Sequence, residues 1–165
     1  MLFFEIVLIV ILLICLWLAF HYIKLLCAKN KADKAFIKFF EKLKKQAVKT
    51  QSFLEELKSA NNIDIELINQ TQGFISKLLE FSIEKDGNER IIGYSNAITL
   101  NINKLLTELE NNNEQITVYV NSRQDFIKAK EDYNNAIKPL KRCVDVFPSS
   151  LMARFKRFTF LDQAI

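Results

Sequence analysis

The sequence contains very little glycine, proline and histidine, and each shortage narrows what the chain can be. Its 165 residues include three glycines, two prolines and one histidine. Because few residues interrupt helices and apolar residues recur about every 3.5 positions, we predict an all-α fold. The single histidine, His21, excludes a di-metal bundle with Glu-x-x-His pairs and leaves structural zinc without a ligand set.

Residue combinations that carry out catalysis are also scarce. No cysteine has a histidine able to activate it, and the isolated glycines form no phosphate-binding loop. Acidic pairs such as Glu55-Glu56 fall on solvated faces of the predicted helices. We therefore predict that the protein is not an enzyme and has no cofactor and no bound metal. The hypothesis that the chain is a hydrolase or a metal enzyme therefore has the least support from the sequence.

A long hydrophobic run near the N-terminus is the strongest feature of the sequence. Ile6–Phe20 contains no charged residue, glycine or proline, and no Lys or Arg occurs before residue 24. With its flanks the run covers about 21 residues, or roughly 31 Å of helix, against a hydrocarbon thickness of ~30 Å. The missing basic residues exclude the n-region of a secretory signal. We predict that residues 1–28 are an uncleaved transmembrane anchor and residues 29–165 a helical-bundle domain.

The distribution of charge predicts how this anchor is oriented. Residues 24–50 contain nine lysines against Asp33 and Glu41. The positive-inside rule then places the N-terminus outside and the C-terminal domain in the cytoplasm of a single-pass cell-membrane protein. The three cysteines, odd in number and far apart, are typical of reduced thiols in that compartment. The lysines suit an anionic inner leaflet, so the lipid bilayer is a predicted partner.

Helical spacing predicts that the anchor is followed by an antiparallel four-helix bundle with long helices. The first helix continues without glycine or proline to about residue 59. Its apolar face is expected at Phe36, Phe40, Leu43, Ala47, Thr50, Leu54 and Leu57. Turns are predicted at Asn61-Asn62, Asp86–Asn88 and Asn111–Asn113, which delimit helices over about 63–85 and 89–110.

The last long helix is predicted over about residues 116–147. Ile116–Val120 is β-branched and taken alone is compatible with a short strand. We predict helix because the apolar pattern continues in phase through Tyr119, Phe126, Tyr133, Ile137, Leu140, Val144 and Phe147. Pro139 is expected to kink this helix near residues 135–139. A short terminal helix is predicted from Leu151 to about Phe158.

The end of this helix carries a recognisable motif. Residues 129–137 read AKEDYNNAI, Phe147-Pro148 follows Tyr133 by fourteen residues, and the sequence SSLMA comes next. This arrangement resembles the LemA family, whose pattern is approximately A-R-x-x-Y-N-x-A-V, then a Phe-Pro pair, a small residue and L-x-A. The match is clearest over residues 129–153. The chain departs from the family pattern in the first bundle helix and after the third, as a divergent member would.

The resemblance implies one N-terminal span, a cytoplasmic helical bundle and no established enzymatic activity. Genes of the family often lie beside a membrane metalloprotease, so a membrane protease is one expected partner. The motif singles out Tyr133 and Asn134. Packing inside the bundle and recognition of a partner protein are both open roles for these two residues.

Basic and aromatic residues alternate near the C-terminal end, at Arg154, Phe155, Lys156, Arg157 and Phe158. A fourth bundle segment returns toward the membrane, so we expect these residues either to contact anionic head groups and the lipid interface or to pack on the bundle. Another basic and aromatic stretch begins at Phe36, but its helical phase is better explained by a core face. No nucleic-acid partner is predicted.

The function predicted from these observations is that of a non-enzymatic scaffold or protein-interaction module of LemA type, anchored at the inner face of a bacterial-type cytoplasmic membrane. The alternative is an envelope or division-associated coiled-coil protein that self-associates through its long helix. The two hypotheses differ in oligomeric state, because the first expects a compact monomer and the second an elongated dimer.

Overall fold

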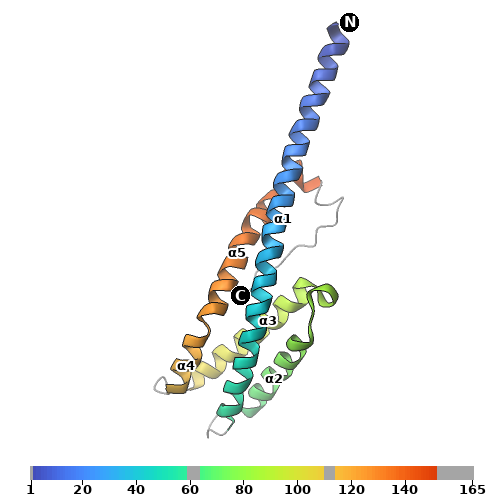
Figure 1. Ribbon diagram of the computed structural model, residues 1–165. Coiled ribbons are helices and arrows are strands. Elements are labelled where there is room, and N and C mark those ends of the chain that lie inside the picture. Colours follow the sequence, from blue (N-terminus) through green and yellow to red (C-terminus); the bar gives the residue numbers. More distant parts are fainter. Residues whose placement is uncertain (1, 59–63, 110–113, 152–165) are drawn as a thin grey trace. The chain divides into compact units, whose positions relative to one another are not determined.

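The computed structural model describes residues 2–58, 64–109 and 114–151, and all regular structure in these ranges is helical. The helices are α1 (Leu2–Leu57), α2 (Ile65–Glu80), α3 (Ile83–Glu108), α4 (Glu114–Ser122) and α5 (Gln124–Asp145) (Figure 1). The predicted all-α fold is confirmed, including the helical structure of Ile116–Val120. The predicted turns at Asn61-Asn62 and Asn111–Asn113 and nearly all of the predicted terminal helix lie outside the described residues.

The chain forms two compact units, which are described separately. Within the described ranges, one unit contains residues 2–34 and 135–151, and the other contains residues 35–134. The helices α1 and α5 each contribute residues to both units.

Helix α1 is continuous over 56 residues, as predicted. Nothing in its sequence interrupts a helix, because neither glycine nor proline occurs between its ends. Nearly all of its large apolar side chains from Phe3 to Phe20 are exposed, whereas the part beyond residue 35 buries one face. That face comprises Phe36, Phe39, Phe40, Leu43, Ala47, Thr50, Phe53, Leu54 and Leu57. It includes all seven positions that the 3- and 4-residue spacing predicted, whereas Val48, expected to widen the face, is 54% exposed.

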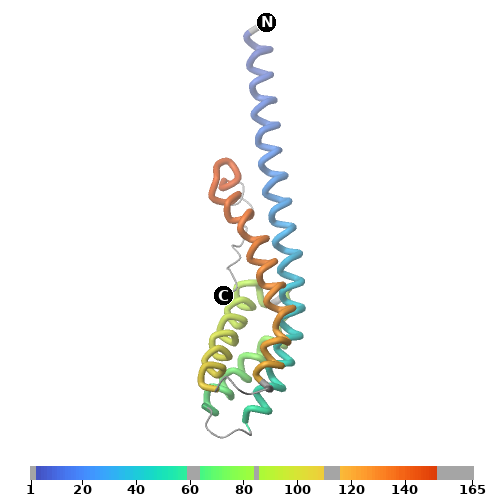
Figure 2. The backbone as a smooth tube through the Cα atoms, turned by 90° about the vertical axis from the view of Figure 1, so that its left-hand side faces the viewer, coloured from blue at the N-terminus to red at the C-terminus, as the bar shows by residue number. Residues whose placement is uncertain are grey.

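Helices α2 and α3 pack side by side in the unit of residues 35–134 (Figure 2). Asp64 caps α2, because its carboxylate accepts a hydrogen bond of 3.0 Å from the Leu67 N–H. This bond satisfies one of the amide groups that have no partner in the first turn of a helix. The residues that the pair buries are Ile68, Thr71, Ile75 and Leu78 of α2 and Ile91, Ile92, Ser95, Ile98, Asn101, Ile102 and Leu105 of α3.

The boundary between α2 and α3 differs from the prediction, because α2 ends at Glu80 and not near residue 85. Phe81 leaves the helix with an extended backbone, and its ring packs edge-on against the Tyr94 ring with centroids 4.9 Å apart. Ser82 is the N-cap of α3, and its N–H donates a hydrogen bond of 2.9 Å to the Asp86 carboxylate. This aromatic contact and this cap explain why α2 stops early.

Gly87 divides α3 into two helical pieces. Its backbone has φ 70° and ψ 154°, values that residues with a Cβ rarely adopt. The predicted change of direction at Asp86–Asn88 is therefore present. It lies inside α3, where the longer helical piece begins directly after Gly87, close to the predicted start at Glu89. The prediction missed the short helical piece from Ile83 that precedes this change of direction.

The predicted single helix over 116–147 is interrupted at Arg123, which forms a turn between α4 and α5. The Ser122 hydroxyl donates to the Tyr119 carbonyl at 2.8 Å, and the Arg123 N–H bonds to the Val120 carbonyl at 3.2 Å. Both bonds have the tight i to i−3 pattern that ends an α-helix. Helix α5 continues through Pro139 from Gln124 to Asp145, so the helix does not break at the position where a kink was predicted.

Candidate interaction surfaces

Tyr133, the centre of the family-like motif, lies in the core of the unit of residues 35–134. Its side chain is fully buried, and its ring centroid lies 5.4 Å from those of Phe36 and Phe39 on α1. The ring stacks on Phe39 and meets Phe36 edge-on, the two arrangements that aromatic pairs prefer. This burial favours packing over recognition as the role of Tyr133. The neighbouring Asn134 is half-buried.

The other sequence-predicted contact residues, Arg154, Phe155, Lys156, Arg157 and Phe158, lie outside the described residues. Their predicted contact with lipid therefore stays a prediction.

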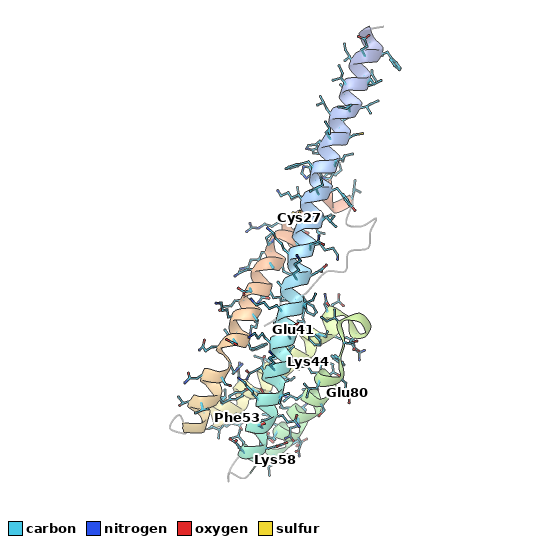
Figure 3. All side chains as sticks on the ribbon, in the orientation of Figure 1. Cys27, Glu41, Lys44, Phe53, Lys58 and Glu80 are labelled. Atoms are coloured by element: carbon cyan, nitrogen blue, oxygen red, sulfur yellow. The ribbon has the colours of Figure 1, made fainter. Side chains whose placement is uncertain are left out.

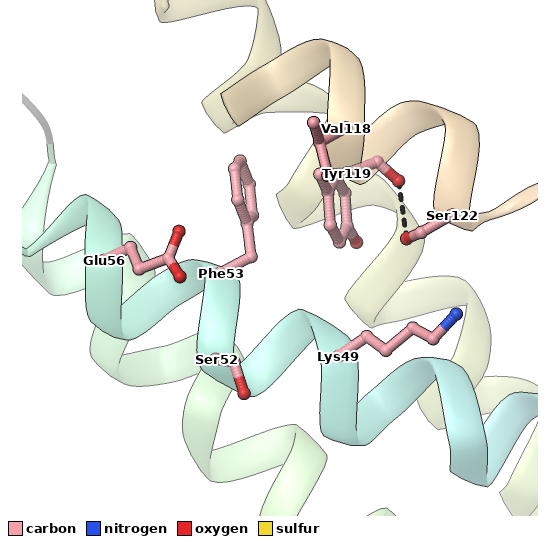
Figure 4. A pocket seen from close by; sticks show the side chains of 7 residues that line it. All are labelled: Lys49, Ser52, Phe53, Glu56, Val118, Tyr119 and Ser122. Atoms are coloured by element: carbon pink, nitrogen blue, oxygen red, sulfur yellow. Dashed lines mark hydrogen bonds between the residues drawn. The ribbon is translucent and has the colours of Figure 1, made fainter. Parts of the chain in front are cut away.

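A groove of about 480 Å³ lies between α1 and α4 (Figure 4). Its described lining consists of Lys49, Ser52, Phe53 and Glu56 from α1 and Val118, Tyr119 and Ser122 from α4. Phe53 and Tyr119 form the aromatic wall, because their rings stack with centroids 4.1 Å apart and planes 8° from parallel. Val118 stands beside them and is 65% exposed.

The hydroxyl of Tyr119 is held in place by a short chain of hydrogen bonds. Thr50 donates to the Gln46 carbonyl at 2.8 Å, which uses the only proton of its hydroxyl. The contact of 2.9 Å between the Tyr119 and Thr50 oxygens is then donated by Tyr119. The Arg123 guanidinium lies 5.8 Å from the centroid of the Tyr119 ring and adds a cation–π contact. Tyr119 is therefore held by one hydrogen bond and by two contacts of its ring.

The groove suits apolar recognition. Its described lining holds no histidine or cysteine, and both serine hydroxyls donate to backbone carbonyls, Ser52 to Val48 and Ser122 to Tyr119. An aromatic wall next to an exposed valine fits an apolar side chain of a partner. The sequence predicted Tyr119 as a core residue. One feature of the sequence indicated an open surface here. Val118, next to Tyr119, is apolar but does not fall on the helix face that the apolar pattern assigns to the core.

A polar layer lies deeper in the same unit. Gln46, Ser95 and Asn101 are buried, and Gln46 Nε2, Ser95 Oγ and Asn101 Nδ2 have no hydrogen-bond partner among the described residues. A cavity of about 20 Å³ adjoins Gln46 and Ser95, which is enough for one water molecule. Buried polar atoms of this kind weaken a core relative to a fully apolar one.

Ion pairs join α1 to α5 along the surface of this unit. Lys42 lies 2.7 Å from Asp125, and Lys38 lies 3.5 Å from Asp132. The hydrogen bond and the charge of Lys42 hold the pKa of the Asp125 carboxyl below its ordinary value. Burial lowers the pKa of Lys130, and the nearby Arg123 charge lowers it further.

Lys44 of α1, labelled in Figure 3, makes one contact with α2 and one within its own helix. Its ammonium donates to the Leu79 carbonyl at 3.1 Å and lies 4.9 Å from the centroid of the Phe40 ring. The carbonyl belongs to the last turn of α2, where orphan carbonyl groups and the helix dipole favour a cation.

Within the described residues, no group of three or more His, Cys, Asp and Glu side chains could hold a metal ion. In the comparisons with known proteins, no family model, no curated protein and no solved structure matches this chain. The fold and the surfaces above are therefore the observations from which function is inferred.

Proposed function

We propose that this protein is a non-enzymatic scaffold or protein-interaction module of LemA type, held at the inner face of a cytoplasmic membrane by the first part of α1. The observation that carries the proposal is α1 itself. One continuous helix joins an apolar segment that is largely exposed among the described residues to a segment that forms the aromatic core of a bundle.

The N-terminal part of α1 is long and apolar enough to cross a membrane. A core helix of a water-soluble protein with this composition is buried by its neighbours. Here Leu12, Leu13 and Ile14 are 54%, 59% and 50% exposed, and they lie on different faces of the helix because consecutive helical residues are about 100° apart. Twelve Ile, Leu, Val and Phe residues in the run together favour insertion by about 5 kcal/mol. Lipid is the cover that suits a helix apolar on all sides.

The lysine distribution supports a cytoplasmic location of the bundle. Nine lysines follow the run within residues 24–50, and no Lys or Arg precedes it. An orientation with the N-terminus outside keeps all of these charges on the cytoplasmic side, beside anionic lipid.

The packing supports a bundle that folds within one chain over the alternative, a self-associating coiled coil. The aromatic face of α1 is covered by its own chain, since Phe36 and Phe39 are buried against Tyr133 of α5. A coiled-coil dimer would need a comparable face to be free. The groove at Phe53 and Tyr119 remains open and gives an interaction module a surface to present.

Membrane insertion is tested by extracting membranes that contain the full-length protein with alkaline carbonate. We expect the protein to stay in the pellet, and recovery in the supernatant would contradict the anchor. Orientation is tested with Lys31→Cys in a chain whose native cysteines are replaced by serine. An impermeant maleimide should label this residue only after the cells are opened.

The scaffold role is tested with a photo-crosslinking amino acid in place of Val118 at the groove. Leu100, which is 52% exposed on α3, serves as the control position. The proposal expects an adduct with a different protein from position 118 and none from position 100. An adduct between two copies of this chain would favour the self-associating alternative, and no adduct at either position would contradict the scaffold role.

A further inference from the structure

Two cations, a histidine and a buried hydroxyl lie together where the apolar part of α1 ends. They belong to the unit of residues 2–34 and 135–151 and surround a cleft of about 320 Å³. Its described lining consists of His21 and Lys24 from α1, Pro139, Arg142 and Cys143 from α5, and Val146 and Ser149 from the turn that follows. The cleft plays no part in the interaction module proposed above.

Contacts with α1 determine the height of this turn relative to the apolar run. The Phe147 ring lies 6.2 Å from the Trp17 ring, and Ser149 Oγ lies 3.5 Å from His21 Nδ1. Trp17 and His21 are one helical turn apart, and Trp17 is inside the apolar run. If α1 spans a bilayer, the turn after α5 therefore lies at the membrane surface and reaches the depth of Trp17.

The turn exposes apolar side chains at this height. Phe147, which the sequence pattern predicted as a core residue, is 62% exposed, so that prediction is wrong for this position. Val146 and Leu151 are also exposed, while Ser149 is buried against His21. Aromatic and aliphatic residues beside a tryptophan are typical of the membrane interface, where they contact glycerol groups and the start of the acyl chains.

The charge of the cleft is positive. Lys24 and Arg142 are both exposed, and neither takes part in a salt bridge among the described residues. Asp145 follows Arg142 by one turn on α5 but is not within salt-bridge distance of it. A phosphate ester can bind to the two cations and to the polar side chains of His21 and Ser149. If the ester also has an apolar tail, that tail can contact the exposed Phe147.

We propose that this cleft binds the head-group phosphate of an anionic phospholipid, with Lys24 and Arg142 as the charged contacts and Phe147 in the interface. The inference rests on the proposed membrane anchor. It adds a second point of lipid contact, at the end of α5, and a preference for anionic over zwitterionic lipid.

The test uses the full-length protein in nanodiscs that contain phosphatidylglycerol and phosphatidylcholine in equal amounts. Native mass spectrometry measures which lipids stay bound to the protein. The variant is Lys24→Gln with Arg142→Gln. The control, Lys31→Gln with Lys34→Gln, removes the same charge from two exposed lysines that do not line the cleft.

We expect the wild type and the control to retain phosphatidylglycerol preferentially. Each cation at an anionic surface is worth about a fivefold change in affinity, so the double variant should lose up to ~25-fold of this preference. An equal loss of preference in the control would mean that only the total charge matters, and it would contradict the proposed lipid site in the cleft. An unchanged preference in the double variant would overturn it too.

Two further measurements separate the possible failures. Carbonate extraction of the same variants shows whether the anchor holds. If the protein stays in the membrane but shows no lipid preference, only the lipid site in the cleft is contradicted. If the protein is extracted, the membrane anchor is contradicted. Glycerol phosphate added at millimolar concentration distinguishes the source of the ligand. Displacement of lipid by this soluble ester would overturn the assignment to a lipid head group.

Discussion

The Tyr119 hydroxyl and the Thr50 hydroxyl lie 2.9 Å apart, and this hydrogen bond joins α4 to α1 under the open groove. Tyr119 also stacks on Phe53 with a centroid distance of 4.1 Å. The hydrogen bond and the stacking are separate contacts of the same ring, and substitutions can remove the first while keeping the second.

The Tyr119→Phe substitution should keep the stacking and remove the hydrogen bond to Thr50. We expect the free energy of unfolding to fall by about 1 kcal/mol, the usual net value of such a bond. Thr50→Val should have a similar effect, and the double variant should cost clearly less than the sum of the two because both remove the same contact. Chemical denaturation followed by circular dichroism measures all three. Additive effects would show that the two hydroxyls are not coupled.

The Tyr133→Ala substitution should be the most damaging single change in this set. The ring is fully buried against Phe36 and Phe39, so truncation leaves a cavity worth about 3–5 kcal/mol. Leu100→Ala, at an exposed position of α3, is the control and should change stability by less than about 0.5 kcal/mol. Equal effects in a thermal unfolding experiment would contradict a core role for Tyr133.

Two glycines of α3 should respond to alanine in opposite directions. Gly87 has φ 70°, so Gly87→Ala strains the backbone and should destabilise the protein by about 1–3 kcal/mol. Gly93 is exposed in the helix, and a Cβ added there meets no atom within 4 Å. Gly93→Ala should therefore stabilise by about 0.5–1 kcal/mol. Matching shifts in melting temperature for both variants would contradict the bend at Gly87.

The ion pair of Lys42 with Asp125 should make stability depend on acid. The pKa of Asp125 is lowered from 3.8 in the folded protein, so its stabilising effect is present above that pH and is lost as the pH falls further. Lys42→Gln should reduce this loss, and Lys45→Gln, which removes an exposed lysine without a salt bridge in the described structure, should leave it unchanged. Because Asp125 is exposed, the difference should be small and should disappear in concentrated salt. Denaturation midpoints measured between neutral and acidic pH check the sign.

The features that the sequence predicted correctly are those that depend on local spacing. The continuity of α1 follows from the absence of glycine and proline, and its buried face follows from apolar residues recurring with the helical period. The positive φ of Gly87 was also predictable, because few other residues adopt that conformation.

The features that it missed depend on contacts between distant residues. The early end of α2 involves Phe81 packing on Tyr94, and the break at Arg123 accompanies its contact with the Tyr119 ring. The groove requires Phe53 and Tyr119 to meet, although they are far apart in the chain. The exposure of Phe147 likewise follows from the turn after α5, since a purely helical pattern would have continued the core stripe through it.

Trp17 is the only tryptophan in the chain, and it lies in the apolar run, next to His21 and Phe147. All of the residues that build the aromatic core from Phe36 to Tyr133 are phenylalanine or tyrosine. Indole emission therefore reports on the unit of residues 2–34 and 135–151 alone, whereas ellipticity sums over the helices of both units. A thermal transition that changes the ellipticity and leaves the indole spectrum constant is therefore assigned to residues 35–134.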